Sequence, residues 1–347
     1  MQQLQPQLNM RVIPTLLAVA ILAARPPDRL TAQLNLGIHH TGLSIGNSRV
    51  WNGVRINFRD TRVVRVRGVN VTLWTPGEKG WGTREVDGLA VGLAPAARHL
   101  HGVGVGVAAV VGATDLRGIH VGGLAVVSNG DIRGVGLGGL AVVANRDLDG
   151  PALGGLAVVA NRDLRGIDFG GLAVVANGNA TGALVGGLAV VAEGELRGLG
   201  VSTLANVGNK GMGGIFVSGL ANVSDGPITG LAVSGLATVG GSLRGLGVSG
   251  LATVGNGDVR GIHIAGLAIV AGDELRGAAL TLARTDAHDL RGGAVAVYNR
   301  VRGEQHGITV GIYNRARSLH GLQLGVLNHV EDAHGIWRWM PVFNFHR

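Results

Sequence analysis

The central part of the chain repeats one pattern of apolar and polar residues every sixteen residues. The clearest copy, residues 154–169, reads GGLAVVANRDLRGIDF. The leucine of this pattern recurs sixteen residues apart, and later fifteen and sixteen apart, at Leu124, Leu140, Leu156, Leu172, Leu188, Leu204, Leu220, Leu236, Leu251 and Leu267. A period held this strictly indicates a repeat architecture.

Within the repeat, apolar residues recur at fixed positions. Counted from Gly118, the second, fourth and tenth positions are aliphatic in most copies, as in Ile119, Val121 and Val127, and the eighth is alanine. These positions share one parity, so they lie on one face of an extended chain. We expect that face to form the core, and we expect the variable third and ninth positions to face outward. The leucine at the seventh position has outward parity unless the two residues before it turn the chain.

Two groups of turn residues divide the repeat into halves of eight residues. One is the Gly-Gly or Ser-Gly pair at the fifth and sixth positions, and the other is an Asn-Gly or Asn-Arg-Asp group. Glycine permits positive φ, and Asn and Asp favour turns. The sequence therefore predicts an all-β repeat protein, a β-solenoid with about 16 residues per coil, whose strands stack about 4.8 Å apart.

The alternative is an up-and-down transmembrane β-barrel of about 16 strands, with one strand per repeat. A strand-like C-terminus containing Phe343 and Phe345 favours it. However, a large membrane barrel has polar residues at alternate positions, aromatic girdles and longer loops on one side. Here both parities are apolar or small and every turn is short, so we favour the solenoid.

The chain divides by composition into four segments. Residues 1–32 predict a signal peptide, since Arg11 precedes an apolar run at 12–24 that is shorter than the roughly 20 residues a spanning helix needs. Residues 33–87 form an N-terminal cap with irregular repeats, 88–330 the regular repeats, and 331–347 an aromatic C-terminal cap. Tryptophans at both ends, such as Trp51 and Trp339, fit caps that cover exposed core and strand edges.

Composition narrows the class of protein. The chain has 62 Gly but only 9 Pro, and it lacks a Gly-X-Y period, which excludes collagen; 46% hydrophobic residues exclude a disordered chain. The absence of cysteine excludes disulfides and thiolate metal sites. A formal net charge of +8 favours anionic partners, either an envelope polymer or a lipid.

One candidate binding surface follows from a recurring acidic-apolar-arginine triplet, as in Asp163-Leu164-Arg165. In a solenoid these triplets stack into acidic and basic rows that pair with one another across coils. We expect mainly an ion-paired edge, and the sharper hypothesis is that the arginines bind a repetitive polyanion. These arginines, with one from a Ser-Leu-Arg copy, are Arg117, Arg133, Arg165, Arg197, Arg244, Arg260, Arg276 and Arg291.

Other chemistry is not predicted. The Asn-Gly-Asp corners at 129–131 and 256–258 resemble calcium corners only weakly, because copies such as 209–211 and 225–227 lack the pattern. His320, His329, His334 and His346 fit no metal spacing. Glycine patterns such as 134–139 lack the strand-turn-helix context of nucleotide sites. We expect no metal, no cofactor, no nucleotide and no enzymatic activity.

Several segments resemble a loosely defined family of bacterial exported surface-repeat proteins. They are GVRINF at 53–58, GVNVTLW at 68–74, GITVGIYN at 307–314 and GLQLGVLN at 321–328, together with the ending PVFNF. The middle of the chain departs from the family pattern by placing alanine where the asparagine stands. The resemblance implies a structural or binding surface of the cell envelope, located in the periplasm, the outer membrane or the cell surface. The barrel alternative implies instead an outer-membrane pore or docking platform.

Overall fold

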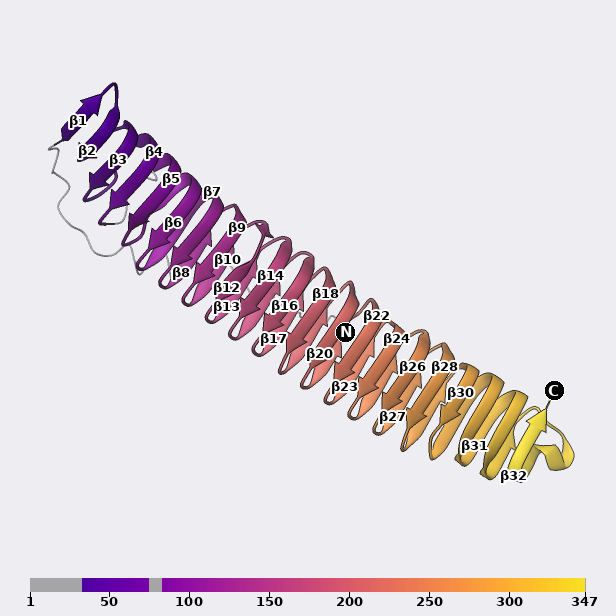
Figure 1. Cartoon of the computed structure of the whole chain (residues 1–347). Coiled ribbons are helices and arrows are strands. Elements are labelled where there is room, and N and C mark those ends of the chain that lie inside the picture. Colours follow the sequence, from indigo (N-terminus) through magenta and orange to yellow (C-terminus); the bar gives the residue numbers. More distant parts are fainter. Residues whose placement is uncertain (1–32, 75–82, 347) are drawn as a thin grey trace, which may run out of the picture. The chain divides into compact units, whose positions relative to one another are not determined.

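The computed structural model describes residues 33–74 and 83–346, so the predicted signal peptide lies outside the described residues. The chain forms two compact units, one up to Asn145 and one from Arg146 onward. Within each unit the chain winds into successive coils of parallel β-strands (Figure 1). The fold is therefore the predicted all-β solenoid.

Within the described residues, the first unit contains ten strands. They are β1 (Leu34–Ile38), β2 (Thr41–Ile45), β3 (Val50–Asn57), β4 (Val63–Thr72), β5 (Thr83–Gly92), β6 (Ala96–Gly106), β7 (Ala109–Gly122), β8 (Ala125–Ser128), β9 (Asp131–Gly138) and β10 (Ala141–Ala144).

The second unit alternates long and short strands. They are β11 (Leu148–Asp149), β12 (Ala152–Gly154), β13 (Ala157–Ala160), β14 (Leu164–Gly170), β15 (Ala173–Ala176), β16 (Ala180–Gly186), β17 (Ala189–Ala192), β18 (Glu195–Ser202), β19 (Ala205–Gly208), β20 (Gly211–Ser218), β21 (Ala221–Val223), β22 (Pro227–Ser234), β23 (Ala237–Gly240), β24 (Ser242–Ser249), β25 (Ala252–Gly255), β26 (Val259–Ala265), β27 (Ala268–Ala271), β28 (Glu274–Thr281), β29 (Arg284–Ala287), β30 (Asp289–Val295), β31 (Tyr298–Val330), the 3-10 helix η1 (Gly335–Arg338) and β32 (Trp339–His346).

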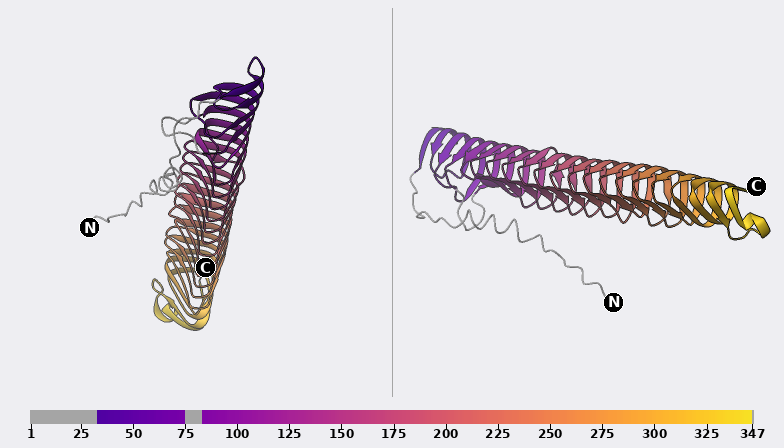
Figure 2. Two further views of the ribbon diagram at one scale, coloured as in Figure 1. Left: turned by 90° about the vertical axis from the view of Figure 1, so that its left-hand side faces the viewer. Right: turned by 90° about the horizontal axis from the view of Figure 1, so that it is seen from below.

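Apart from β1 and β32, the strands pair in parallel with the equivalent strand one coil away. In the second unit Leu164 pairs with Ala180, and Ala180 pairs with Leu196, so the register advances by sixteen residues per coil. Long strands stack on long strands and short strands on short strands, which produces two layers (Figure 2). Neighbouring strands of an up-and-down barrel run antiparallel, so the barrel alternative is wrong.

In most long strands a glycine with positive φ bends the chain, usually directly after an arginine. Gly198 has a φ of 107°, and a Cβ there would lie 2.2 Å from the carbonyl oxygen of Gly182, the equivalent glycine of the preceding coil. Only glycine combines that backbone conformation with so close an approach of two backbones. The glycines that follow the arginines therefore form a column, here called the backbone column, in which the backbones of successive coils lie in close contact.

The predicted assignment of faces is wrong. The second and fourth positions, predicted as core, face outward, as Ile119 and Leu137 show. The third and ninth positions, predicted to face outward, are buried, as in Phe216 and Asn206, each 0% exposed. The alternation was identified correctly, but alternation alone does not tell which parity faces inward. The error came from assuming that the more regularly apolar face is the core.

At the buried third position, a large side chain on one coil lies next to a glycine on the neighbouring coil in two places. Phe216 stacks in register with Gly200, where an added Cβ would lie 2.9 Å from the ring. His263 pairs in the same way with Gly247. Variation at this position, which looked like a sign of exposure, therefore reflects packing between neighbouring coils at nearly constant volume.

Antiparallel strands flank the parallel coils at two places. In the first unit β1 pairs antiparallel with β2, and in the second unit β32 pairs antiparallel with β31. Such strands satisfy backbone groups that the end of a parallel stack would leave open. The limits of the predicted caps, 33–87 and 331–347, stay a prediction.

Candidate functional site

All eight predicted arginines lie on the long strands, each directly before a glycine. In the second unit Arg244, Arg260, Arg276 and Arg291 occupy one register column on four consecutive coils. In the same unit Arg165 and Arg197 are two coils apart, with Thr181 in register between them. In the first unit Arg117 pairs in register with Arg133. The structure thus brings the arginines of each unit into columns.

Carboxylates neutralise much of this arginine edge. Arg165 lies 3.0 Å from Asp149 and 2.6 Å from Asp163, and Arg260 contacts Asp258 at 2.8 Å. The remaining pairs join Arg117 to Asp115, Arg133 to Asp131, Arg197 to Glu195, and Arg291 to Glu274. Within the described residues Arg244 and Arg276 form no ion pair. The ion pairing predicted from the triplets is present, both within a coil and between coils.

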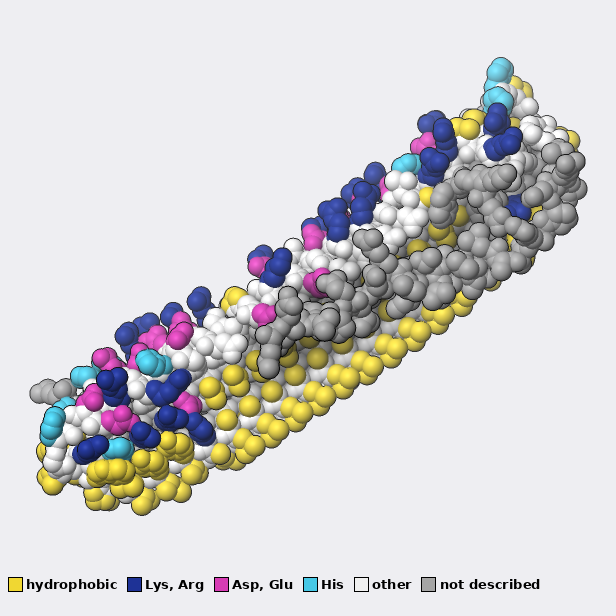
Figure 3. Space-filling model, turned by 180° about the vertical axis from the view of Figure 1, so that it is seen from behind, with side chains coloured by type: hydrophobic (Ala, Val, Ile, Leu, Met, Phe, Trp, Pro, Cys, Tyr) yellow, Lys and Arg dark blue, Asp and Glu magenta, His cyan; other side chains and the backbone are white. Residues whose placement is uncertain are grey.

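The most extensive surface feature is apolar. In the second unit a column of half-exposed leucines follows the corner after each long strand, consisting of Leu156, Leu172, Leu188, Leu204, Leu220, Leu236, Leu251 and Leu267. Aliphatic and aromatic side chains of the long strands form two further outward columns beside it, including Ile167, Phe169, Ile215, Val217, Ile262 and Ile264. Figure 3 shows these apolar rows and, along the opposite edge, the charged side chains.

The core, by contrast, contains polar groups. Asn206 donates a hydrogen bond to Asn222 on the next coil at 3.0 Å, and both side chains are fully buried. Burial raises the pKa of Asp168 to about 7, against a weaker lowering effect of the backbone at Ala152. In the first unit, burial lowers the pKa of His120 to about 4. Relative to an ordinary protein, these coils carry more of their hydrophobic character on the outside.

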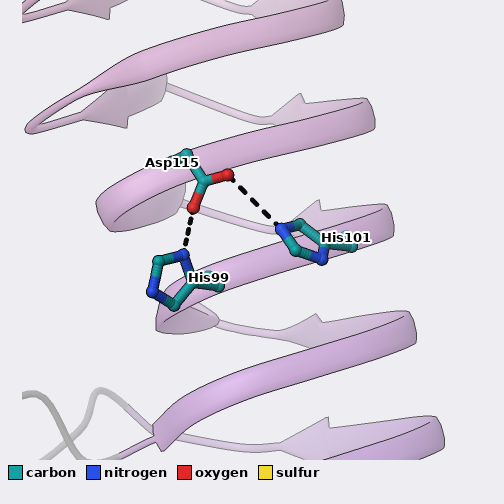
Figure 4. Close-up of side chains that lie close together, drawn as sticks. All are labelled: His99, His101 and Asp115. Atoms are coloured by element: carbon teal, nitrogen blue, oxygen red, sulfur yellow. Dashed lines mark hydrogen bonds and ion pairs between the residues drawn. The ribbon is translucent and has the colours of Figure 1, made fainter.

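A cluster of histidines and carboxylates lies on the outer surface of the first unit (Figure 4). His99 and His101, both on β6, converge on Asp115 of β7. The His99 ring forms a short hydrogen bond with Asp115, and His101 Nε2 lies 3.3 Å from Asp115 Oδ2. On the other side His101 Nδ1 lies 3.3 Å from Asp87 of β5. Burial acts to raise the pKa of Asp115, but hydrogen bonds with His99 and His101 lower it overall.

The sequence did not lead us to predict this cluster, although one signal was present. His99 and His101 are separated by one residue, so they project on the same side of a strand. Asp115 follows His99 by sixteen residues, one full repeat, which places it next to His99 on the adjacent coil. Combining the short spacing with the repeat length would have identified the group.

Among the residues that the structure describes, the histidines near the C-terminus form no such site with carboxylates. His329 stacks on Trp339 with ring centroids 3.9 Å apart, and Tyr313 stacks on Trp339 at 6.4 Å. Because these rings cover one another, we interpret them as packing between β31 and β32.

Comparison with known proteins does not assign the chain to a family. No family model, no curated protein and no solved structure matches it. Within the ranges that the structure describes, no helix has both the length and the apolar character that crossing a bilayer requires.

Proposed function

We propose that this protein is a non-enzymatic scaffold of the bacterial cell envelope that lies against a lipid surface through its outward apolar columns. One observation supports this most strongly: the leucine that recurs in every regular copy of the repeat, from Leu124 to Leu267, is about half exposed. Large exposed apolar patches on a folded protein mark interaction surfaces. The charged edge on the opposite side then faces water.

The distribution of apolar residues favours lipid over a second copy of the chain. In the second unit the leucine column stands at the corner between the two layers, and apolar side chains continue along the long strands beside it. A second copy docked on one flat layer would leave the corner only partly covered. A lipid interface surrounds whatever enters it, so it accommodates a corner together with both adjoining faces. The positive net charge of the chain adds attraction to anionic lipids.

The energy available is sufficient for reversible binding. Fully burying a leucine contributes about 1.5–3 kcal/mol, so completing the burial of a half-exposed one contributes roughly 1 kcal/mol. Leu204, for example, is 43% exposed. Eight such leucines in the second unit would together supply roughly 8 kcal/mol before the entropic cost of binding.

A flotation experiment with anionic vesicles tests the proposal. We expect residues 33–347 to float with vesicles of phosphatidylglycerol and phosphatidylethanolamine. The combined variant Leu188→Ser, Leu204→Ser and Leu220→Ser should bind at least about tenfold more weakly, since each leucine contributes roughly 1 kcal/mol. The control variant Arg165→Gln with Arg197→Gln, on the opposite edge, should lose less than about threefold, because it removes only electrostatic attraction.

Equal flotation of the leucine variant and the wild type would contradict the proposal. Sedimentation velocity without lipid tests whether a second copy of the chain, instead of lipid, covers the apolar columns. If the wild type fails to float but dimerises, and the leucine variant does not dimerise, the apolar columns bind a second copy instead.

The arginine column from Arg244 to Arg291 supports a second candidate function, binding of a polyanion. Arg244 and Arg276 have no carboxylate partner within the described part of the chain, so no ion pair there competes with an anionic polymer for them. Salt-sensitive binding of a sulfated or phosphorylated polysaccharide that is lost in Arg244→Gln with Arg276→Gln would support it. Unchanged binding in that variant would contradict it.

A further inference from the structure

The cluster on the first unit occupies two adjacent register columns on three successive strands. One column contains Glu85, His99 and Asp115, and the other contains Asp87, His101 and Arg117. Side chains in adjacent columns on the same side of parallel strands are close neighbours, so two histidines and two carboxylates can converge. None of these residues belongs to the apolar columns of the proposed function.

The distances match those between the ligands of a metal ion. One ligand atom from each of His99, His101 and Asp115 lies within 4.8 Å of the other two. Zinc binds nitrogen and oxygen at about 2.0–2.2 Å in a tetrahedron, which places neighbouring ligand atoms about 3.3 Å apart. His101 Nε2 and Asp115 Oδ2 are separated by 3.3 Å. A metal ion would replace the hydrogen bond between His99 and Asp115 with a bond from each of the two groups to the ion.

We propose that His99, His101 and Asp115 bind one divalent transition-metal ion, and that zinc fits the group best. Two imidazole nitrogens with one carboxylate oxygen form a ligand set typical of zinc, whereas calcium and magnesium prefer oxygen ligands alone. The side chains of His99 and His101 are 44% and 33% exposed, which leaves room for water to complete the coordination.

Asp87 orients one of the ligands. It lies 3.3 Å from His101 Nδ1, the ring nitrogen that does not face Asp115. If Nδ1–H donates to Asp87, Nε2 is left with a free lone pair directed toward the metal position. Such a carboxylate behind a metal-binding histidine commonly strengthens metal binding by 10–100-fold.

Two nearby arginines, Arg117 and Arg65, form ion pairs with carboxylates of the cluster. Arg117 Nε lies 2.7 Å from Asp115 Oδ2 and shares that oxygen with His101, while Oδ1 faces His99. Arg65 binds Glu85 at 2.8 Å, and we therefore do not include Glu85 among the ligands.

Isothermal titration of metal-free residues 33–347 with zinc chloride tests the site. We expect one zinc ion per chain. His99→Ala and His101→Ala should each weaken binding at least tenfold, and Asp87→Asn should weaken it about tenfold while the stoichiometry stays at one. Cobalt in place of zinc should give visible absorption typical of four-coordinate nitrogen and oxygen ligation.

A matched control separates this site from general binding by surface histidines. His306 and His320 are also neighbours on the surface, with stacked rings 4.7 Å apart, but they belong to the second unit. The double variant His306→Ala and His320→Ala should bind zinc as the wild type does. Circular dichroism of each variant checks that its β-structure is retained. Absence of zinc binding by the wild type, or wild-type binding by His99→Ala with His101→Ala, would overturn the proposal.

Discussion

At the scale of single residues, two neighbouring glycines of β30 have different roles. Gly292 has a φ of 132°, and a Cβ there would lie 2.1 Å from the carbonyl oxygen of Gly277. At Gly293 the nearest atom to an added Cβ is 3.9 Å away. We expect Gly292→Ala to lower the free energy of unfolding by at least about 1–3 kcal/mol, because it adds backbone strain and a clash. Gly293→Ala should change it by less than about 1 kcal/mol, as measured by guanidinium denaturation. Equal effects of the two substitutions would contradict the backbone column.

The buried carboxyl of Asp168 makes stability depend on pH. Its pKa is about 7 in the folded protein, against 3.8 as the ordinary value. Between these values the unfolded chain releases a proton that the folded chain keeps, so the free energy of unfolding falls as the pH rises, by about 4 kcal/mol in total. Above pH 7 the loss is complete, and below pH 4 it is absent.

Asp168→Asn should therefore stabilise the protein at pH 8 and have little effect at pH 4. Guanidinium denaturation of the variant and the wild type at both pH values measures this difference. Other titrating groups, such as His120, contribute equally to both proteins and therefore cancel. Asp163→Asn, on the charged edge of the same coil, serves as control and should show no gain at pH 8. A wild type that loses no stability relative to Asp168→Asn between pH 4 and pH 8 would contradict this prediction.

At the scale of elements, the coil is the unit of the fold. Ala189 pairs with Ala205, sixteen residues later, and the corner leucines Leu188 and Leu204 are equivalent. Deleting residues 189–204 removes one whole coil and joins equivalent positions, so every remaining strand keeps its register. We expect this deletion to retain the wild-type circular dichroism spectrum per residue and a similar melting temperature.

Deleting residues 189–196 instead joins Leu188 to Arg197 and removes half a coil. The corner would then be followed by the last six residues of the long strand β18, and the register of both layers would be lost. We expect a large loss of β-structure or aggregation. Similar behaviour of the two deletions in circular dichroism would show that the coil does not define the fold.

At the scale of the whole molecule, the sequence predicted the architecture better than the surfaces. The sixteen-residue period and the glycine and asparagine corners were enough to predict stacked coils. The orientation of the faces was predicted wrongly because Val142 and Asn206 occupy the same buried position, so hydrophobicity does not distinguish inside from outside here. The arginine columns followed from the period. The His99 cluster did not, because it combines residues from different repeats that share no local motif.

The leucine column and the charged edge lie on opposite sides of the coils. Together they determine how a unit is oriented about its stacking axis. On a lipid surface, a unit seated by its leucines has one preferred angle of rotation about its stacking axis, because any other angle would expose leucines or bury arginine–carboxylate pairs. The charged side chains would then always point away from the lipid, with their columns repeating at the strand spacing of about 4.8 Å. Each molecule would therefore present rows of paired charges to the surrounding water, whatever direction it takes within the plane of the surface.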